Sequence, residues 1–176
     1  MIRRNLLAGA AAGAGLAAAF VRSAAAQTST MSPTNMSPER TAQMALGGMA
    51  FALATSQLAA QRGESATVKT FAQLETEEQL AFAEARRMAG LPVPAPSMMD
   101  AQKQQMVTQL QSMSGAQFDR MYVQGQMMGH QELLQLHQAI AQSGSRTEER
   151  MLGTVAVPAI RTHLAMLQGI QQQARG

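Results

Sequence analysis

From Pro38 to Gln173 the chain consists mainly of Ala, Gln, Leu, Met and Glu, which are among the strongest helix formers. The alternation of β-branched or aromatic residues with polar ones, which marks strands, is missing from this stretch. Aromatic residues make up only 3% of the chain. The stretch therefore predicts an all-α fold, and its Gly and Pro residues show where each helix ends.

These interruptions predict four long helices and one short helix. We expect the long helices at 38–61, 65–89, 114–142 and 145–173, and the short one at 98–113. Gly63, Gly90 and Gly144 suit helix ends, and three prolines exclude a helix from Leu91 to Pro96. Capping-box patterns precede the last three helices at Ser97 and Asp100, Ser114 and Gln117, and Ser145 and Glu148.

The lengths of the connections predict how these helices pack. Tight turns join the first two long helices and the last two, so each pair should be antiparallel neighbours. The Pro-rich segment and the short helix are long enough to carry the chain back across the molecule between the two pairs. Residues 38–173 are therefore expected to form one helical bundle with a crossover.

The first 26 residues have the layout of a secretory signal peptide. Arg3 and Arg4 precede an apolar stretch from Leu6 to Val21, and Ala24-Ala25-Ala26 forms a small-residue cleavage site. The paired arginines fit a twin-arginine signal or an ordinary Sec signal, and an uncleaved anchor is the third reading. We expect export to the periplasm or outer membrane, with residues 27–37 as a flexible linker and no transmembrane segment in the mature chain.

Composition excludes several classes of function. The chain has no Cys, so it has no disulfide and no thiolate metal site. Its formal net charge is +3, but Arg3, Arg4 and Arg22 lie in the signal segment, and the residues after it hold equal numbers of basic and acidic side chains. Because nucleic-acid binding needs a clustered positive face, no nucleic-acid partner is expected.

Helical periodicity brings polar side chains onto apolar faces. On the second helix, Glu75, Glu78 and Gln79 fall in the arc that also holds Val68 and Phe71. Burying a carboxylate is unfavourable unless it is paired, protonated or bound to a metal. These carboxylates are therefore either members of buried pairs or ligands.

Histidines occupy similar positions on the last two helices. His163 lies at the centre of the apolar stripe of the last helix, and His130 and His137 share one flank of the helix before it. Glu132 lies at the edge of that helix's apolar stripe, on which Gly125 and Gly129 would allow another backbone to approach. Glu75, Glu78, His130 and His163 are thus candidate ligands for iron, manganese or zinc, and a metal-free histidine and glutamate pair in the core is the alternative.

The methionines suggest a second metal hypothesis. Thioethers favour Cu(I), and Met127 and Met128 with His130 would be the local ligands. However, Met99, Met106 and Met113 recur every seven residues, as core residues of a bundle do. Core packing is therefore the preferred interpretation of the methionines.

Three stretches carry a family resemblance: Phe118-Asp119-Arg120-x-Tyr122, Gly129-His130-Gln131-x-Leu133, and Val157-Pro158-x-Ile160-x-x-His163-Leu164. With Val68-Lys69-x-Phe71-Ala72, they resemble the exported bacterial family called domain of unknown function 4142. The resemblance covers most of residues 40–172. It implies a ferritin-like four-helix bundle with the short extra helix in the crossover.

The resemblance also limits the metal hypothesis. Many family members carry Asp-His where this chain has Glu78-Gln79, and the Glu-x-x-His pattern of ferritin-like di-iron sites is absent. A mononuclear or degenerate site therefore fits better than a standard di-iron oxidase site.

Three hypotheses of function follow. The first is a non-enzymatic structural role in the periplasm or envelope, without a catalytic residue. The second is a metal-binding or oxidase-like protein with a Glu and His site in the bundle core. The third is an interaction module that presents an apolar helix face to an envelope protein or lipid.

Overall fold

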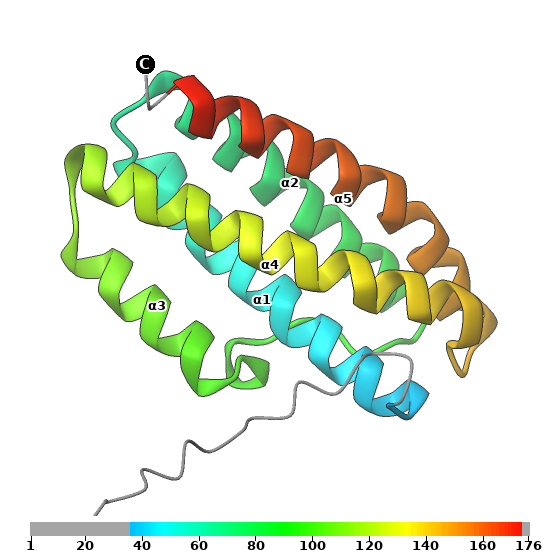
Figure 1. Ribbon diagram of the computed structural model, residues 1–176. Coiled ribbons are helices and arrows are strands. Elements are labelled where there is room, and N and C mark those ends of the chain that lie inside the picture. The colour runs from blue at the N-terminus through cyan, green and yellow to red at the C-terminus, as the bar shows by residue number, and fades with distance from the viewer. Residues whose placement is uncertain (1–35, 174–176) are drawn as a thin grey trace, which may run out of the picture. The chain divides into compact units, whose positions relative to one another are not determined.

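The computed structural model describes residues 36–173, and all regular structure in this range is helical (Figure 1). The elements are α1 (Pro38–Arg62), α2 (Ala66–Met88), the short 3-10 turn η2 (Pro96–Met98), α3 (Ala101–Ser112), α4 (Gly115–Ser143) and α5 (Thr147–Gln173). The predicted all-α fold, with four long helices and one short one, is confirmed. The predicted signal peptide and most of the predicted linker lie outside the described residues.

The four long helices form a ring in the order α1, α2, α5, α4, and α3 packs on the outside against α1 and α4 (Figure 1). The closest pairs are α1 with α2, α1 with α4, and α4 with α5, whereas α2 and α5 contact each other less extensively. The seam between α2 and α5 is therefore the least tightly closed side of the ring.

Two aromatic contacts fix the relative direction of α2 and α4. Phe71 lies beside Tyr122, with ring centroids 6.4 Å apart, and Phe82 lies beside His137 at 5.9 Å. Both helices therefore run the same way, although each is antiparallel to its ring neighbours. Such an arrangement requires a crossover between the two helical hairpins, and the segment from Ala89 through α3 provides it, as the connection lengths predicted.

The start of α3 differs from the prediction. Helix 98–113 with a Ser97 and Asp100 capping box was expected, but Pro96–Met98 is a separate 3-10 turn and Met99 is extended. Asp100 caps α3 directly, because its Oδ1 accepts a hydrogen bond from the Lys103 amide at 2.9 Å. An Asp at the N-cap satisfies the free amides of the first turn, so α3 begins at Ala101.

The other two capping boxes do not form either. The side chain of Ser114 makes no capping hydrogen bond. Ser145 donates to Oε1 of Glu39 at 2.9 Å, so its hydroxyl connects the turn between α4 and α5 to α1 and does not cap α5.

The core contains three apolar clusters, and a polar layer lies between the two larger ones. One cluster includes Phe71, Tyr122 and Leu167, and the other includes Leu133 and Ile160. Both draw buried residues from α1, α4 and α5 at different levels of these helices, so the polar layer lies part-way along the bundle. It contains the candidate site.

The glycines of α4 have a different role from the one expected. A side chain at Gly125 or Gly129 would meet the ring of Phe51, and Gly125 also faces the sulfur of Met106. The backbone approach predicted at these glycines is therefore wrong, because α1 fills the space with an aromatic ring. The close backbone approaches occur at Gly47 against Met98 and at Gly153 against α4.

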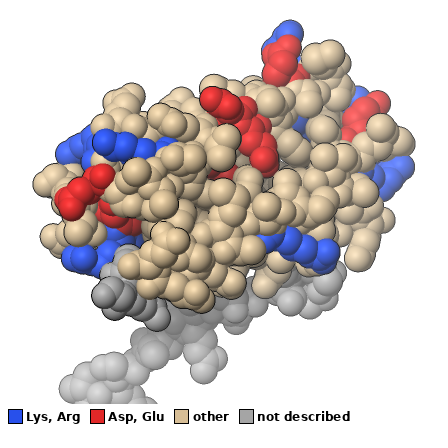
Figure 2. Space-filling model, turned by 90° about the horizontal axis from the view of Figure 1, so that it is seen from above, with Lys and Arg blue, Asp and Glu red and all other residues tan. Residues whose placement is uncertain are grey.

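The surface of the described residues gives two further results. No helix among them is both long and apolar enough to span a membrane. On the face shown in Figure 2, Lys and Arg side chains are scattered and separated by acidic and uncharged ones. This face therefore carries no continuous positive patch.

Candidate metal centre

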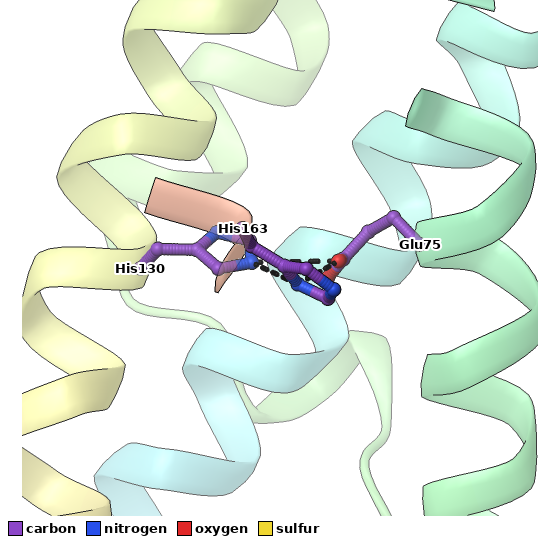
Figure 3. A group of neighbouring side chains, drawn as sticks. All are labelled: Glu75, His130 and His163. Carbon is purple, nitrogen blue, oxygen red and sulfur yellow. Dashed lines mark hydrogen bonds and ion pairs between the residues drawn. The ribbon is translucent and has the colours of Figure 1, made fainter. Parts of the chain in front are cut away.

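Glu75 of α2, His130 of α4 and His163 of α5 meet in the polar layer (Figure 3). Oε2 of Glu75 lies 2.8 Å from Nδ1 of His163 and 3.4 Å from Nε2 of His130. The two imidazole nitrogens are 3.2 Å apart. One atom from each of three helices therefore points at a common centre.

All three side chains are withdrawn from solvent. The side chains of Glu75 and His130 are 0% and 1% exposed, and that of His163 is 11% exposed. The ring of Phe71 stands edge-on to His163, with centroids 5.7 Å apart. The site is thus closed on the Phe71 side and reaches the surface only at the edge of His163.

Each of the three side chains is held at its other end. Oε1 of Glu75 accepts a hydrogen bond from the Gln79 side-chain amide at 3.0 Å. Nδ1 of His130 lies 2.9 Å from the Gln126 carbonyl oxygen. A carbonyl oxygen can only accept, so Nδ1 carries the hydrogen and donates it. This leaves Nε2 of His130 facing the common centre.

His163 is oriented in the same way by Glu78. Nε2 of His163 lies 3.2 Å from Oε2 of Glu78, whose side chain is 41% exposed. Nδ1 of the same ring faces Glu75. Glu78 therefore contacts the ring from its outer side, whereas the inner nitrogen points into the site.

The charges of the cluster are strongly coupled. Burial alone would raise the pKa of the Glu75 carboxyl, but the contacts with His130 and His163 outweigh burial and hold this pKa well below its usual range. Burial would lower the pKa of His163, but the carboxylates of Glu75 and Glu78 raise it to about 10. At neutral pH the cluster therefore holds a carboxylate and an imidazolium.

One acceptor in the cluster remains incompletely satisfied. Oε2 of Glu75 is buried and accepts no well-directed hydrogen bond, although Nδ1 of His163 is only 2.8 Å away. The two groups attract by charge, but the N–H is not aimed along the line between them. A buried carboxylate oxygen without a directed donor is uncommon, and a cation at the common centre would satisfy it.

The spacing of the three atoms suits a metal ion. Metal bonds to His nitrogen and carboxylate oxygen are about 2.0–2.2 Å long. Octahedral or tetrahedral angles then place neighbouring ligand atoms about 2.9–3.5 Å apart. The observed separations of 2.8, 3.2 and 3.4 Å lie close to this range. Two histidines and one carboxylate are therefore arranged so that they could coordinate a single ion.

Comparison with known families shows which family the chain belongs to. The family described as Domain of unknown function (DUF4142) matches residues 21–170. The chain belongs to this family. No curated protein and no solved structure matches it. The matched range of this DUF4142 chain includes all three residues of the cluster.

Most of the sequence-predicted residues meet in this DUF4142 protein. Glu75, His130 and His163 converge, and Glu78 contacts His163 from outside. Glu132 does not join them, because its carboxylate forms an ion pair with Lys103 of α3 at 2.8 Å. Glu132 lies at the edge of the helix, as its place beside the apolar stripe predicted, and its partner there is a cation of α3.

The surroundings of Met127, Met128 and His130 speak against the local copper site. His130 is buried, whereas the side chain of Met128 is 45% exposed, so the two do not converge. Met127 packs against the apolar cluster that contains Tyr122. Core packing, the preferred interpretation, therefore holds for Met127 but not for Met128, which lies at the surface.

The sequence reasoning missed a buried network beside the cluster in this DUF4142 protein. The side-chain amide of Gln126 donates to Oγ1 of Thr55 at 2.8 Å and to Oγ of Ser56 at 3.0 Å. Oγ of Ser56 also shares a hydrogen bond of 2.9 Å with the hydroxyl of Tyr122. Gln126 therefore fixes α1 with its side chain and His130 with its carbonyl. Its position one turn before His130 was the available signal.

Proposed function

We propose that this DUF4142 protein is an exported helical-bundle protein that binds one divalent transition-metal ion between Glu75, His130 and His163. Zinc, iron and manganese are the candidate ions, since histidine and carboxylate donors suit them. The observation that carries the proposal is the convergence of three donor atoms from three helices, each side chain being fixed at its other end.

The partners of these side chains favour a metal site over a purely structural polar layer. Metal-binding histidines almost always donate their second ring N–H to a carboxylate or backbone carbonyl. Glu78 and the Gln126 carbonyl stand in these positions. Oε2 of Glu75 is ion-paired with His163 at 2.8 Å but accepts no well-directed hydrogen bond, and a metal ion would satisfy it.

The geometry supports a single-ion site. The three donors occupy one side of the common centre, and Glu78 is turned to the outer edge of His163. Three protein ligands leave coordination positions free for water or a small molecule, as in catalytic zinc sites and facial-triad iron sites. The bundle topology, with one long crossover between two helical hairpins, supports the ferritin-like relationship that the family resemblance implied.

The proposed location rests on the sequence of the first 26 residues. Their two arginines, apolar stretch and Ala-rich cleavage site are the pattern of an export signal. The bundle would then act in the periplasm or at the cell envelope.

The test is metal binding by the mature chain. Protein purified without chelator and without an affinity tag is analysed for metal content, then stripped and titrated with Zn²⁺ and Co²⁺ by calorimetry and absorption spectroscopy. We expect one ion per chain and a Co²⁺ spectrum of a nitrogen and oxygen site. Absence of stoichiometric binding for zinc, cobalt, iron and manganese would contradict the proposal.

Matched variants separate the site from general histidine binding. Glu75→Gln and His163→Gln should weaken binding at least a hundredfold, whereas His137→Gln, which changes a buried histidine outside the cluster, should leave it unchanged. Glu78→Gln should weaken it about 10–100-fold, the usual effect of losing an orienting partner. Equal losses in all four variants would show that the ion binds elsewhere or that folding is lost, and circular dichroism distinguishes these two outcomes.

A further inference from the structure

A cavity of about 540 Å³ opens at the end of the bundle where α2 and α4 begin and α5 ends. Val68 of α2, Val123 of α4 and Ile170 of α5 contribute apolar side chains to its wall. Val68 and Val123 are almost fully buried, at 2% and 5% exposure. The cavity lies on the seam between α2 and α5, which are the least closely packed neighbours of the ring.

The cavity and the candidate metal centre lie on the same faces of α2, α4 and α5. Val68, Val123 and Ile170 each lie seven residues from a member of the cluster on the same helix. Seven residues span about 10.5 Å of helix, or about two turns, so the cavity and the cluster share the inner stripes of three helices.

Buried side chains separate the two, and those of α2 and α5 are apolar. Phe71 and Leu167 lie between these levels on α2 and α5, and they are 2% and 0% exposed. The ring of Phe71 rests edge-on against His163. A molecule in the cavity would therefore contact apolar side chains below it and would not touch the metal centre.

The cavity offers hydrogen bonds, and its charged residues Glu64, Asp119 and Arg120 leave a net charge of −1. Both carboxylate oxygens of Asp119 are already used, because they accept from the amides of Glu64 at 3.0 Å and Ser65 at 2.7 Å. Arg120 and Glu64 bring opposite charges to the rim. The remaining polar groups of the lining are the hydroxyls and amides of Ser65, Thr67, Gln124, Gln171 and Gln173.

We propose that this cavity binds a small uncharged organic molecule that has an apolar body and a hydrogen-bonding group. The apolar wall takes the body, and the amides and hydroxyls of the rim take the polar group. The volume lies within the range of about 300–1,000 Å³ that is usual for small-molecule sites. The proposal does not depend on metal binding at Glu75.

The experiment uses N-phenyl-1-naphthylamine, an uncharged fluorophore whose emission rises in apolar surroundings. Titration into the folded protein should give saturable binding of one molecule per chain. Ala116→Trp places an indole at an exposed alanine of the lining, in the first turn of α4, and should weaken binding at least tenfold. Ala101→Trp, an exposed alanine in the first turn of α3 that is remote from the cavity, should leave the affinity within twofold.

Two comparisons test the chemistry and the location. The anionic analogue 1-anilinonaphthalene-8-sulfonate should bind at least tenfold more weakly, and equal or tighter binding would overturn the assignment of an uncharged ligand. Glu75→Gln should not change the affinity for the uncharged probe, so failure of the metal proposal and failure of this one are distinguishable.

A deletion tests whether the chain itself is the occupant. Removing residues 174–176, which follow the Gln173 of the cavity rim, should leave the affinity within twofold. A tenfold gain would show that the C-terminal residues fill the cavity and would overturn the proposal. Absence of saturable binding in the parent chain, or equal binding by Ala116→Trp and the parent, would also overturn it.

Discussion

His137 lies on α4 seven residues after His130 and is almost equally buried, but its neighbours are different. The ring of Phe82 stands edge-on to it, with centroids 5.9 Å apart, and its Nδ1 is buried without a hydrogen-bond partner. Burial and the positive charge of Arg86 lower the pKa of His137 to about 4. This histidine is therefore neutral in the folded protein over most of the acid range in which the unfolded chain gains a proton.

His137 should make the fold sensitive to mild acid. Its pKa is lower in the folded state than in the unfolded state, where it is about 6.5. As the pH falls from 7.5 to 5, protonation of the unfolded chain should therefore remove about 2 kcal/mol of stability. His137→Leu should lose less stability over this interval, by about that amount, in urea melts at the two pH values. Equal losses in the parent and in His137→Leu would contradict the prediction.

At the scale of residues, periodicity identified all three members of the cluster. Glu75, His130 and His163 were predicted because a carboxylate or imidazole in an apolar stripe is conspicuous. Periodicity did not predict that Glu75 is fully buried whereas Glu78 is 41% exposed. The two residues are about one helical turn apart, so both fall on the same face of the helix. Gln126 was missed because an amide in a glutamine-rich chain has no distinctive pattern.

At the scale of elements, the close contact between α4 and α5 depends on a glycine. A methyl group at Gly153 would lie 2.9 Å from the backbone nitrogen of Ala141 and 3.1 Å from the carbonyl oxygen of His137. Backbone atoms inside a helix cannot move aside singly. Gly153 therefore sets how closely these two helices pack.

We expect Gly153→Ala to destabilise the protein by about 1–3 kcal/mol, since overpacking forces the helices apart. Gly169→Ala in the same helix is the matched control, because a methyl group there meets no atom within 4 Å. Alanine should instead stabilise α5 at this position by up to about 1 kcal/mol, through its higher helix propensity. Thermal and urea unfolding of both variants give the comparison, and the same sign of change in both would refute the explanation.

Elements were predicted better than their contacts. The long helices follow from composition and from the Gly and Pro residues, which act locally. The start of α3 depended on a choice between two polar residues, and Asp100 capped the helix whereas Ser97 did not. Which glycine would face a backbone could not be predicted, because it depends on the bulk of residues distant in sequence, such as Phe51.

At the scale of the whole molecule, the proposed signal peptide predicts where the mature chain would begin. We expect the protein recovered from the periplasm of a Gram-negative host to start at Gln27, because Ala24 and Ala26 present the small side chains that cleavage requires. Intact mass spectrometry measures this directly. Replacing Ala24 and Ala26 with leucine should block cleavage. If the parent chain is exported but keeps residues 1–26, these residues act as an anchor instead.

The paired arginines separate the two export routes. Replacing Arg3 and Arg4 with lysine keeps the positive charge that a Sec signal needs but removes the twin-arginine motif. Loss of export would assign the twin-arginine route, and unchanged export would assign the Sec route.

The cluster of Glu75, His130 and His163 draws on both helical hairpins, one residue from the first and two from the second. It can be complete only after the crossover has brought the hairpins together, which is the step with the greatest loop-closure entropy. We therefore expect the cluster to form after the folding transition state, and contacts made that late mainly change the rate of unfolding. An ion bound there would therefore slow unfolding, so the folded chain would last longer, while the rate of folding would be nearly unchanged.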